Sequence, residues 1–231
     1  MPAVFLSLIL LLATGQAPAS DAKDVRTIYL ALLSKGAAWT SSGAPELQRL
    51  QQAHADYLSK LAITGQVIAN GPIGDEADLR GLVLFTAAGL DEARQLMSDD
   101  PAVKATRLAA DVIALSVASQ LFVAAPGRDD TPVRQFVVGL LNAQPGAADD
   151  PGADAGRATY LARLRDSGLL VFAADATDRR RRGLLVFASD NAAAVKALAA
   201  DDPAVKAGRV AIEWHTWFAP DGVMRIAKTG S

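Results

Sequence analysis

The spacing of apolar residues along the chain changes several times, and each change predicts a new element of secondary structure. Short apolar runs at residues 25–33 and 67–69 are typical of strands. Between them, from Pro45 onward, the apolar positions recur every three or four residues. This spacing predicts a helix that begins near Pro45 and ends at Gly65.

Five further features complete the first half. A turn at Asn70-Gly71-Pro72 leads to a strand at residues 81–85, and the acidic start of residues 91–97 suits a helix. Asp100-Pro101 favours the start of a short helix, because Asp caps the first turn and Pro fits within it. The apolar segment at residues 108–123 predicts a strand. The predicted order is therefore β-α-β-β-α-β.

The second half repeats these patterns. The sequence Asp-Asp-Pro-Ala-Val-Lys-Ala occurs at residues 99–105 and again at 201–207, each time after a glycine-led apolar strand. A repeat of this length that occurs twice indicates a duplicated domain. The second half is predicted to contain strands at 133–141, 169–172, 183–187 and 210–218, and helices at 155–167 and 191–199.

This order predicts an α+β chain built from two ferredoxin-like βαββαβ units. A sheet with helices on one face leaves its other face uncovered, so we expect the two sheets to pack face to face as an intramolecular pseudo-dimer. The predicted boundaries are a signal peptide at 1–19, a first domain at 20–123, a linker at 124–132, a second domain at 133–219 and a C-terminal tail at 220–231.

The N-terminus is typical of an exported protein. Residues 4–13 form an apolar block too short to span a bilayer comfortably, and Ala17-Pro18-Ala19 suits cleavage by signal peptidase. Because no Lys or Arg precedes the block, an uncleaved anchor or a misassigned start remains the alternative. The sequence contains no cysteine, which excludes a lipoprotein anchor and disulfides. We expect a periplasmic or secreted protein.

Composition narrows the range of partners. The formal net charge is −2 and 51% of the residues are apolar, so the chain as a whole is not drawn to nucleic acid or to a membrane surface. The two histidines lie far apart in the sequence, and no glycine-rich phosphate loop, nucleophile elbow or dinucleotide fingerprint is present. We expect a small-molecule ligand and neither a metal nor a cofactor; further association into a homo-oligomer is left open.

Several short motifs together resemble the YCII-related domain family. They are His54 with Tyr57-Leu58 on the predicted helix, Gly71-Pro72, the strand at Gly81, and Asp100-Pro101. The resemblance covers residues 25–118 well and residues 133–218 less well. It implies a dimeric α+β barrel and a His–Asp pair in a cleft, so the predicted catalytic residues are His54 and Asp100.

The second half departs from that pattern. Arg157 stands where His54 stands in the first half, and Ala174-Asp175 replaces Gly71-Pro72, whereas Asp202-Pro203 is kept. The second unit is therefore interpreted as a degenerate copy. Because Asp202 persists without a histidine, helix capping explains much of the aspartate at both positions.

Two functions from different classes remain open, and so does the question of whether the chain is an enzyme. In the first, His54 transfers a proton on a small metabolite without a cofactor, and Asp100 orients its ring. In the second, the barrel is a non-catalytic module for ligand binding or interaction. Arg179–Arg182 could clamp an anion or form a solvated hairpin tip. His215 lies on the last predicted strand, on the same face as Trp217, where an interface or core role is favoured.

Overall fold

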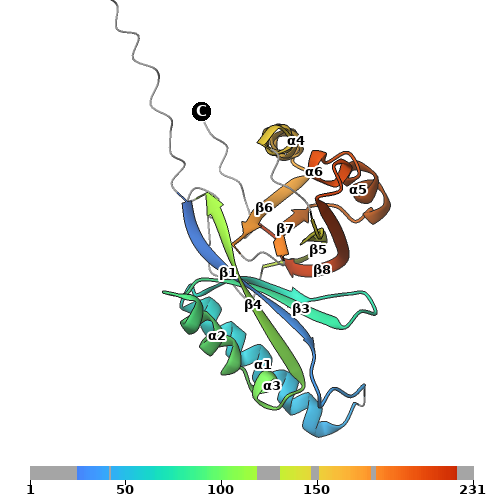
Figure 1. Ribbon diagram of the computed structural model, residues 1–231. Helices are drawn as coiled ribbons and strands as arrows, with labels where there is room; N and C mark the ends of the chain where they lie inside the picture. Colours follow the sequence, from blue (N-terminus) through green and yellow to red (C-terminus); the bar gives the residue numbers. More distant parts are fainter. Residues whose placement is uncertain (1–24, 42, 119–130, 147–150, 178–180, 223–231) are drawn as a thin grey trace, which may run out of the picture.

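The computed structural model describes residues 25–41, 43–118, 131–146, 151–177 and 181–222 (Figure 1). The first half contains β1 (Val25–Lys35), α1 (Pro45–Ile63), β2 (Val67–Pro72), β3 (Leu79–Phe85), α2 (Leu90–Ser98), α3 (Pro101–Lys104) and β4 (Leu108–Ala118). The second half contains β5 (Val133–Ala143), α4 (Pro151–Asp166), β6 (Leu170–Ala176), β7 (Arg181–Phe187), α5 (Ala192–Ala199), α6 (Pro203–Lys206) and β8 (Val210–Pro220). The same order of elements thus occurs twice, as the apolar spacing predicts.

The strands of both halves form one antiparallel sheet in the order β2-β3-β1-β4-β6-β7-β5-β8. The halves meet at two seams. At the first, β4 pairs with β6 through Leu115–Ala176 and Ser116–Asp175. At the second, Ile73, just beyond β2, forms a bridge with Trp217 of β8. Because both ends of each half are joined to the other half, the sheet closes into a barrel.

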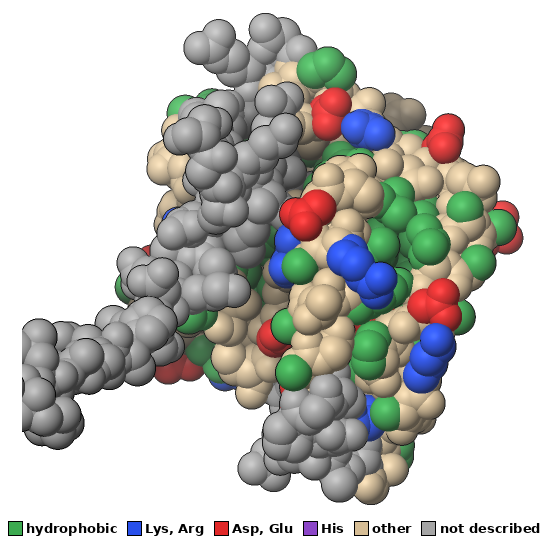
Figure 2. Space-filling model, turned by 90° about the horizontal axis from the view of Figure 1, so that it is seen from above, with side chains coloured by type: hydrophobic (Ala, Val, Ile, Leu, Met, Phe, Trp, Pro, Cys, Tyr) green, Lys and Arg blue, Asp and Glu red, His purple; other side chains and the backbone are tan. Residues whose placement is uncertain are grey.

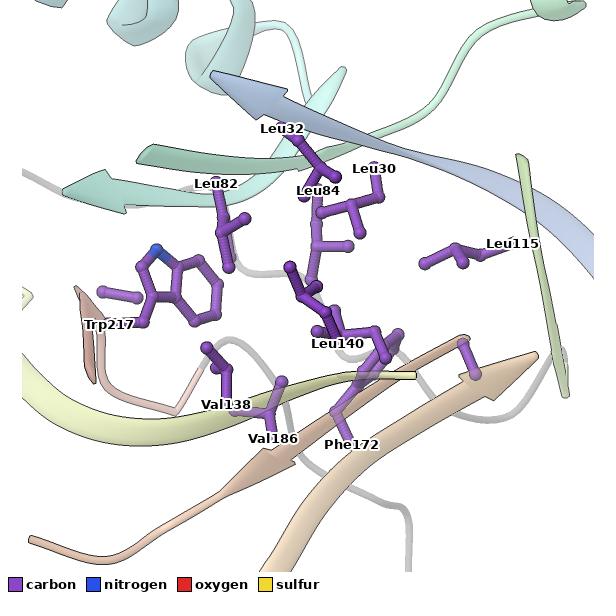
Figure 3. Packing of buried hydrophobic residues seen from close by; sticks show 14 of the residues in the cluster. Leu30, Leu32, Leu82, Leu84, Leu115, Val138, Leu140, Phe172, Val186 and Trp217 are labelled. Carbon is purple, nitrogen blue, oxygen red and sulfur yellow. The ribbon is translucent and has the colours of Figure 1, made fainter. Parts of the chain in front are cut away.

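The barrel interior is a single apolar core to which both halves contribute (Figure 3). The first half supplies side chains that point toward those of the second half, among them Leu30, Leu32, Leu82, Leu84 and Leu115 on one side and Val138, Leu140, Phe172, Val186 and Trp217 on the other. The predicted face-to-face packing is confirmed, and so is the α+β class. The expectation of two separate sheets is refined, since the pairing at the seams joins them.

The helices cover the outside of the barrel, with α1 to α3 on the first half and α4 to α6 on the second (Figure 1). Each set encloses its own smaller core. Leu58 of α1 and Met97 of α2 pack with Phe85 of β3, while Leu161 of α4 and Val195 of α5 belong to the matching cluster in the second half. Alternate residues of each strand therefore serve different cores, one inside the barrel and one under the helices.

The prediction of a turn at Asn70-Gly71-Pro72 is wrong. These residues continue β2, where Gly71 pairs with Leu82 and Pro72 with Gly81 of β3. The reversal of the chain comes later, between β2 and β3. Gly71 is required for a different reason, because a Cβ there would collide with the carbonyl oxygen of Phe218 on β8. The glycine thus permits the close approach of β2 and β8 at the second seam.

Several predicted features lie outside the described residues. They are the signal peptide, residues 124–130 of the linker, the end of the strand predicted to reach residue 123, Arg179 and Arg180, and residues 223–231 of the tail. The domain boundaries that depend on them stay predictions. None of the helices in the described ranges has the length and apolar character that a membrane span requires. The face shown in Figure 2 carries acidic and basic side chains interspersed, not gathered into a patch of one sign.

Candidate functional site

A pocket of about 270 Å³ opens between α1 and the strands of the first half. Its walls are largely apolar, and its polar side chains are those of His54, Asn70 and Arg80. The remaining lining residues are Leu33, Ala55, Leu58, Gly71, Pro72, Gly81, Leu82, Val83 and Leu108. The pocket therefore collects His54, Gly71-Pro72 and Gly81, which the sequence singles out separately.

His54 and Asp100 are in direct contact. The Nδ1 atom of His54, on α1, lies 2.6 Å from Oδ2 of Asp100, which precedes α3. The His54 side chain is 24% exposed, whereas that of Asp100 is 1% exposed. With Nδ1 facing a carboxylate, the proton of a neutral imidazole belongs on Nδ1, which leaves the Nε2 lone pair available. Within the described residues Nε2 makes no hydrogen bond.

Asp100 has a structural task as well. Its Oδ1 atom accepts a hydrogen bond of 2.8 Å from the backbone N–H of Ala102, which caps the N-terminus of α3. The two carboxylate oxygens thus serve two different donors. The cap fixes the orientation of the carboxylate, and the carboxylate in turn fixes the ring of His54.

Tyr57 holds the helix that carries His54. It lies one turn after His54 on α1, and its hydroxyl donates a hydrogen bond of 2.8 Å to the backbone oxygen of Leu96 on α2. Burial raises the pKa of the Tyr57 hydroxyl above its ordinary value, and the nearby charges of Asp99 and Asp100 add to the effect. The phenol therefore remains a hydrogen-bond donor at neutral pH and ties α1 to α2.

The matching site of the second half contains no such arrangement. Nε of Arg157 lies 3.1 Å from Oδ2 of Asp202, and its Nη1 lies 3.3 Å from Oδ1 of Asp175. Asp202 also caps its helix, through a hydrogen bond of 2.8 Å from the N–H of Ala204. The guanidinium thus takes the place of the imidazole and joins two carboxylates.

Comparison with known proteins identifies the first half. The model of the YCII-related domain family matches residues 29–115, a span that contains every residue lining the pocket and both members of the His54–Asp100 pair. Residues 29–115 are a YCII-related domain. No functionally curated protein matches the chain.

Solved structures resemble most of the chain and not only its YCII-related domain. A protein provisionally described as a chlorite dismutase has a TM-score of 0.59 at 11% identity, over 85% of this chain and 96% of its own. A heme-binding protein from Thermus thermophilus has a TM-score of 0.51 at 15% identity, over 86% and 94%. A chlorite dismutase variant from Candidatus Nitrospira defluvii has 0.53 at 11%, over 85% and 92%. At these identities the likeness shows a shared dimeric α+β barrel fold.

His215 lies not in the pocket of the YCII-related domain but at the second seam. Its Nδ1 is 2.7 Å from Oδ2 of Asp75, and its Nε2 is 3.1 Å from Oε1 of Glu213. The other oxygen of Asp75 accepts a hydrogen bond of 3.0 Å from the backbone N–H of Thr216. Asp75 belongs to the loop between β2 and β3, so this cluster links that loop to the second half. The favoured interface role of His215 fits this position.

The electrostatics of Asp75 follow from that position. Desolvation raises the pKa of the Asp75 carboxyl, but the hydrogen bonds from His215 and from the Thr216 N–H outweigh it and hold the pKa below its ordinary value. The carboxylate form is therefore favoured in the folded protein.

Sequence reasoning missed Arg80, Asn70 and Asp75. A usable signal existed for Arg80, because Arg182 precedes Gly183 in the second half as Arg80 precedes Gly81 in the first. Asp75 lies in a loop without a counterpart motif, and its partner His215 is distant in the sequence. Among the residues that the structure describes, no group of His, Cys, Asp and Glu side chains could hold a metal ion.

Proposed function

We propose that the YCII-related domain of this chain catalyses proton transfer on a small molecule without a cofactor. His54 is the general acid and base, and Asp100 is the residue that positions it. The observation that carries the proposal is the contact of 2.6 Å between His54 Nδ1 and a buried Asp100 carboxylate, at the wall of a pocket. This arrangement leaves Nε2 as the proton acceptor.

The reaction step needs only these two side chains and the substrate. Nε2 of His54 takes a proton from a substrate C–H or O–H, and the electron pair of that bond stays on the substrate. The imidazolium that forms faces the Asp100 carboxylate, which stabilises its positive charge. The proton then returns to another atom of the substrate or to a leaving group, which corresponds to isomerase or lyase chemistry.

A heme, which one of the structural neighbours binds, does not match the residues of this pocket. The cavity of about 270 Å³ is smaller than the range of about 300–1,000 Å³ typical for drug-sized ligands, and a heme is larger than such ligands. Of the usual axial ligands, His, Cys, Met and Tyr, only His54 lines the pocket. Both ring nitrogens of His215 already face carboxylates. The residues present do not fit a heme, so the proposed chemistry involves none.

The alternative is a binding module that has lost its reaction. The observation in its favour is Asp202, which caps its helix as Asp100 does but without a histidine. Helix capping alone is therefore sufficient to explain the presence of an aspartate at this position in both halves. In such a protein the pocket would bind a ligand, and His54 would donate or accept a hydrogen bond without transferring a proton.

The experiment follows exchange of substrate hydrogen for deuterium. The mature protein is incubated in deuterated buffer with a panel of small carbon acids, and deuterium uptake is measured by mass spectrometry. His54→Ala should lower the exchange rate by about 100-fold or more, the lower end of the usual contribution of a general base. Its melting temperature should fall by only a few degrees, because the substitution removes a single hydrogen bond and leaves the fold intact. Catalysed exchange that persists in His54→Ala would refute the role of His54, and absence of exchange with every compound would favour the binding module.

Asp100→Asn and Asp202→Asn form a matched pair of controls. Asn still caps a helix, so both variants should fold. Only Asp100→Asn removes a carboxylate that faces a histidine, so only this variant should lose exchange activity. Equal activities in the two variants would contradict the positioning role of Asp100.

We also propose that the chain is exported and that its second half is a diverged copy of the YCII-related domain. The apolar block at residues 4–13 with Ala17-Pro18-Ala19 supports export, and the repeated Asp-Asp-Pro-Ala-Val-Lys-Ala sequence supports duplication. Mass spectrometry of the protein from a periplasmic fraction should give a chain that begins at Ser20. A full-length chain in the membrane fraction would instead indicate an uncleaved anchor, and a full-length chain in the cytoplasmic fraction would refute export.

A further inference from the structure

Arg80 lines the same pocket as His54 but has no counter-charge. Within the described part of the chain its guanidinium makes no ion pair, and its hydrogen bonds go to backbone oxygens only. Arg157, in the second half, instead binds two carboxylates. A half-buried guanidinium without a carboxylate partner in a mainly apolar pocket can bind an anionic group of a ligand.

The acidic residues nearest to Arg80 in sequence are engaged elsewhere or exposed. Asp75 binds His215 and the N–H of Thr216. Asp78 forms an ion pair of 3.3 Å with Lys35. Glu76, the third acid of this loop, is exposed. The loop therefore supplies no internal carboxylate that would compete with a ligand for Arg80.

Other contacts hold the Arg80 guanidinium in place. Its Nη1 donates to the backbone oxygens of Asp75, at 3.1 Å, and Ala77, at 3.4 Å. The guanidinium carbon lies 5.5 Å from the centre of the Trp39 ring, and that of Arg107 lies 4.3 Å from the same ring. Nη1 is thus occupied, while the other nitrogens are not bonded to any described residue and remain available to a ligand. Because the group is already held, binding costs it little conformational entropy.

We propose that Arg80 binds the carboxylate of a small carboxylic acid, whose apolar body packs against Leu58 and Leu108 and whose reactive end lies at His54. A single guanidinium matches a single negative charge and the planar shape of a carboxylate, which favours a monocarboxylate over a phosphate dianion. The volume of the pocket restricts the ligand to a small molecule. The reaction at His54 rests on the proposed function, whereas binding at Arg80 does not.

The second half supplies a matched control. Arg182 of β7 occupies the register position of Arg80, since Gly183 pairs with Leu141 as Gly81 pairs with Leu33. The side chain of Arg182 is exposed, and together with Arg209, whose hydrogen bond has the larger effect, its charge lowers the pKa of Asp154. Arg182→Gln therefore removes the same charge without touching the pocket.

The experiment compares acids with their amides. Binding of acetate, butyrate, hexanoate and benzoate, and of the corresponding primary amides, is measured by ligand-detected NMR and calorimetry on the mature protein. At least one acid should bind about tenfold or more tightly than its amide, the loss expected when a charged hydrogen bond is removed. Arg80→Gln should abolish this preference, Arg80→Lys should restore part of it, and Arg182→Gln should leave it unchanged.

The outcomes separate this proposal from the proposed function. If no acid binds more tightly than its amide, or if Arg80→Gln keeps the preference, the carboxylate site is refuted, even if deuterium exchange depends on His54. The acid–amide comparison in the unaltered protein decides the matter even if Arg80→Gln does not fold. If the preference depends on Arg80 but no compound exchanges deuterium, the site stands and the proton transfer fails. His54→Gln should retain the preference, because it keeps Arg80.

Discussion

The two halves of the barrel place the same buried aspartate at the start of the same short helix, yet they give it different partners. Asp100 faces an imidazole that opens onto a pocket, whereas Asp202 faces a guanidinium that reaches on to a third side chain, Asp175. Even the supporting tyrosines agree, since Tyr57 and Tyr160 each donate to a backbone oxygen of the following helix. The scaffold of the two sites is therefore common, and the partner of the aspartate is what differs.

The difference shows on which side chain the proposed proton transfer depends. An imidazole whose Nδ1 faces a carboxylate keeps a lone pair on its other nitrogen, so it can accept a proton. A guanidinium has five donors and no acceptor and stays charged at any physiological pH, so it can bind carboxylates but cannot exchange a proton. The first half thus contains a side chain that can accept a proton, and the second half has a network of charges in which each carboxylate faces the same guanidinium.

The largest effect is expected when this network of charges is broken. Arg157→Ala leaves Asp202, whose side chain is 2% exposed, without its cation. It should lower the free energy of unfolding by about 3 kcal/mol, as expected for a buried charge that loses its partner. His54→Ala removes a single hydrogen bond and should cost about 1–2 kcal/mol. Urea unfolding measures both values, and a larger loss in His54→Ala would contradict the contrast between the two sites.

His54→Arg, which gives Asp100 the kind of partner that Asp202 has, should change stability less but abolish deuterium exchange. In His54→Arg the guanidinium can bind Asp100 as Arg157 binds Asp202, but Pro72 offers no carboxylate in place of Asp175. The free energy of unfolding should therefore stay within about 1 kcal/mol of the original. Deuterium exchange should disappear, because Arg accepts no proton. Residual exchange above that of His54→Ala would show that the reactive group lies elsewhere.

The smallest effect concerns the seam between the halves and disappears in acid. Because the folded protein holds the pKa of Asp75 below its ordinary value, the carboxylate contributes stability above the unfolded pKa, and this contribution is lost as the pH falls through the folded pKa. The melting temperature of Asp75→Asn should lie below that of the original protein at pH 6, and the gap should narrow below about pH 4. A gap that widens in acid would show the opposite sign. Asp78→Asn, at an exposed ion pair, is the control.

Much of the fold could be predicted from the sequence because its signals are local and occur twice. The helix face from Pro45, the strands led by Gly81 and Gly183, and the Asp-Pro helix starts each depend on neighbouring residues. The contact between His54 and Asp100 could be anticipated only through a family resemblance, because it joins two helices that are distant in sequence. The prediction of a turn at Asn70-Gly71-Pro72 was wrong because the glycine is needed for the close approach of β2 to Phe218 on β8. That contact is tertiary, so local turn preferences do not reveal it.

The positions of the Arg80 and Asp75 side chains depend on the closure of the barrel as well as on residues near them in the sequence. Arg80 is a candidate for binding an anion because the acidic side chains of its loop do not pair with it. Asp75 in particular is bound by His215 and Thr216, which come from the far end of the chain. From the neighbouring sequence alone, Asp75 is expected to be an ordinary solvent-exposed residue of a loop. Its function becomes visible only when β2 and β8 lie next to each other.

The hydrogen bond between Asp75 and His215 makes the pocket of the first half depend on the second half. The loop between β2 and β3 accepts hydrogen bonds from Arg80 through its backbone oxygens. The same loop is held by His215 on β8, a strand of the second half. The second half therefore helps to fix the position of a side chain that lines the pocket of the first half. We therefore expect a substitution of His215 to change the position of the loop that binds Arg80, and with it the shape of the pocket.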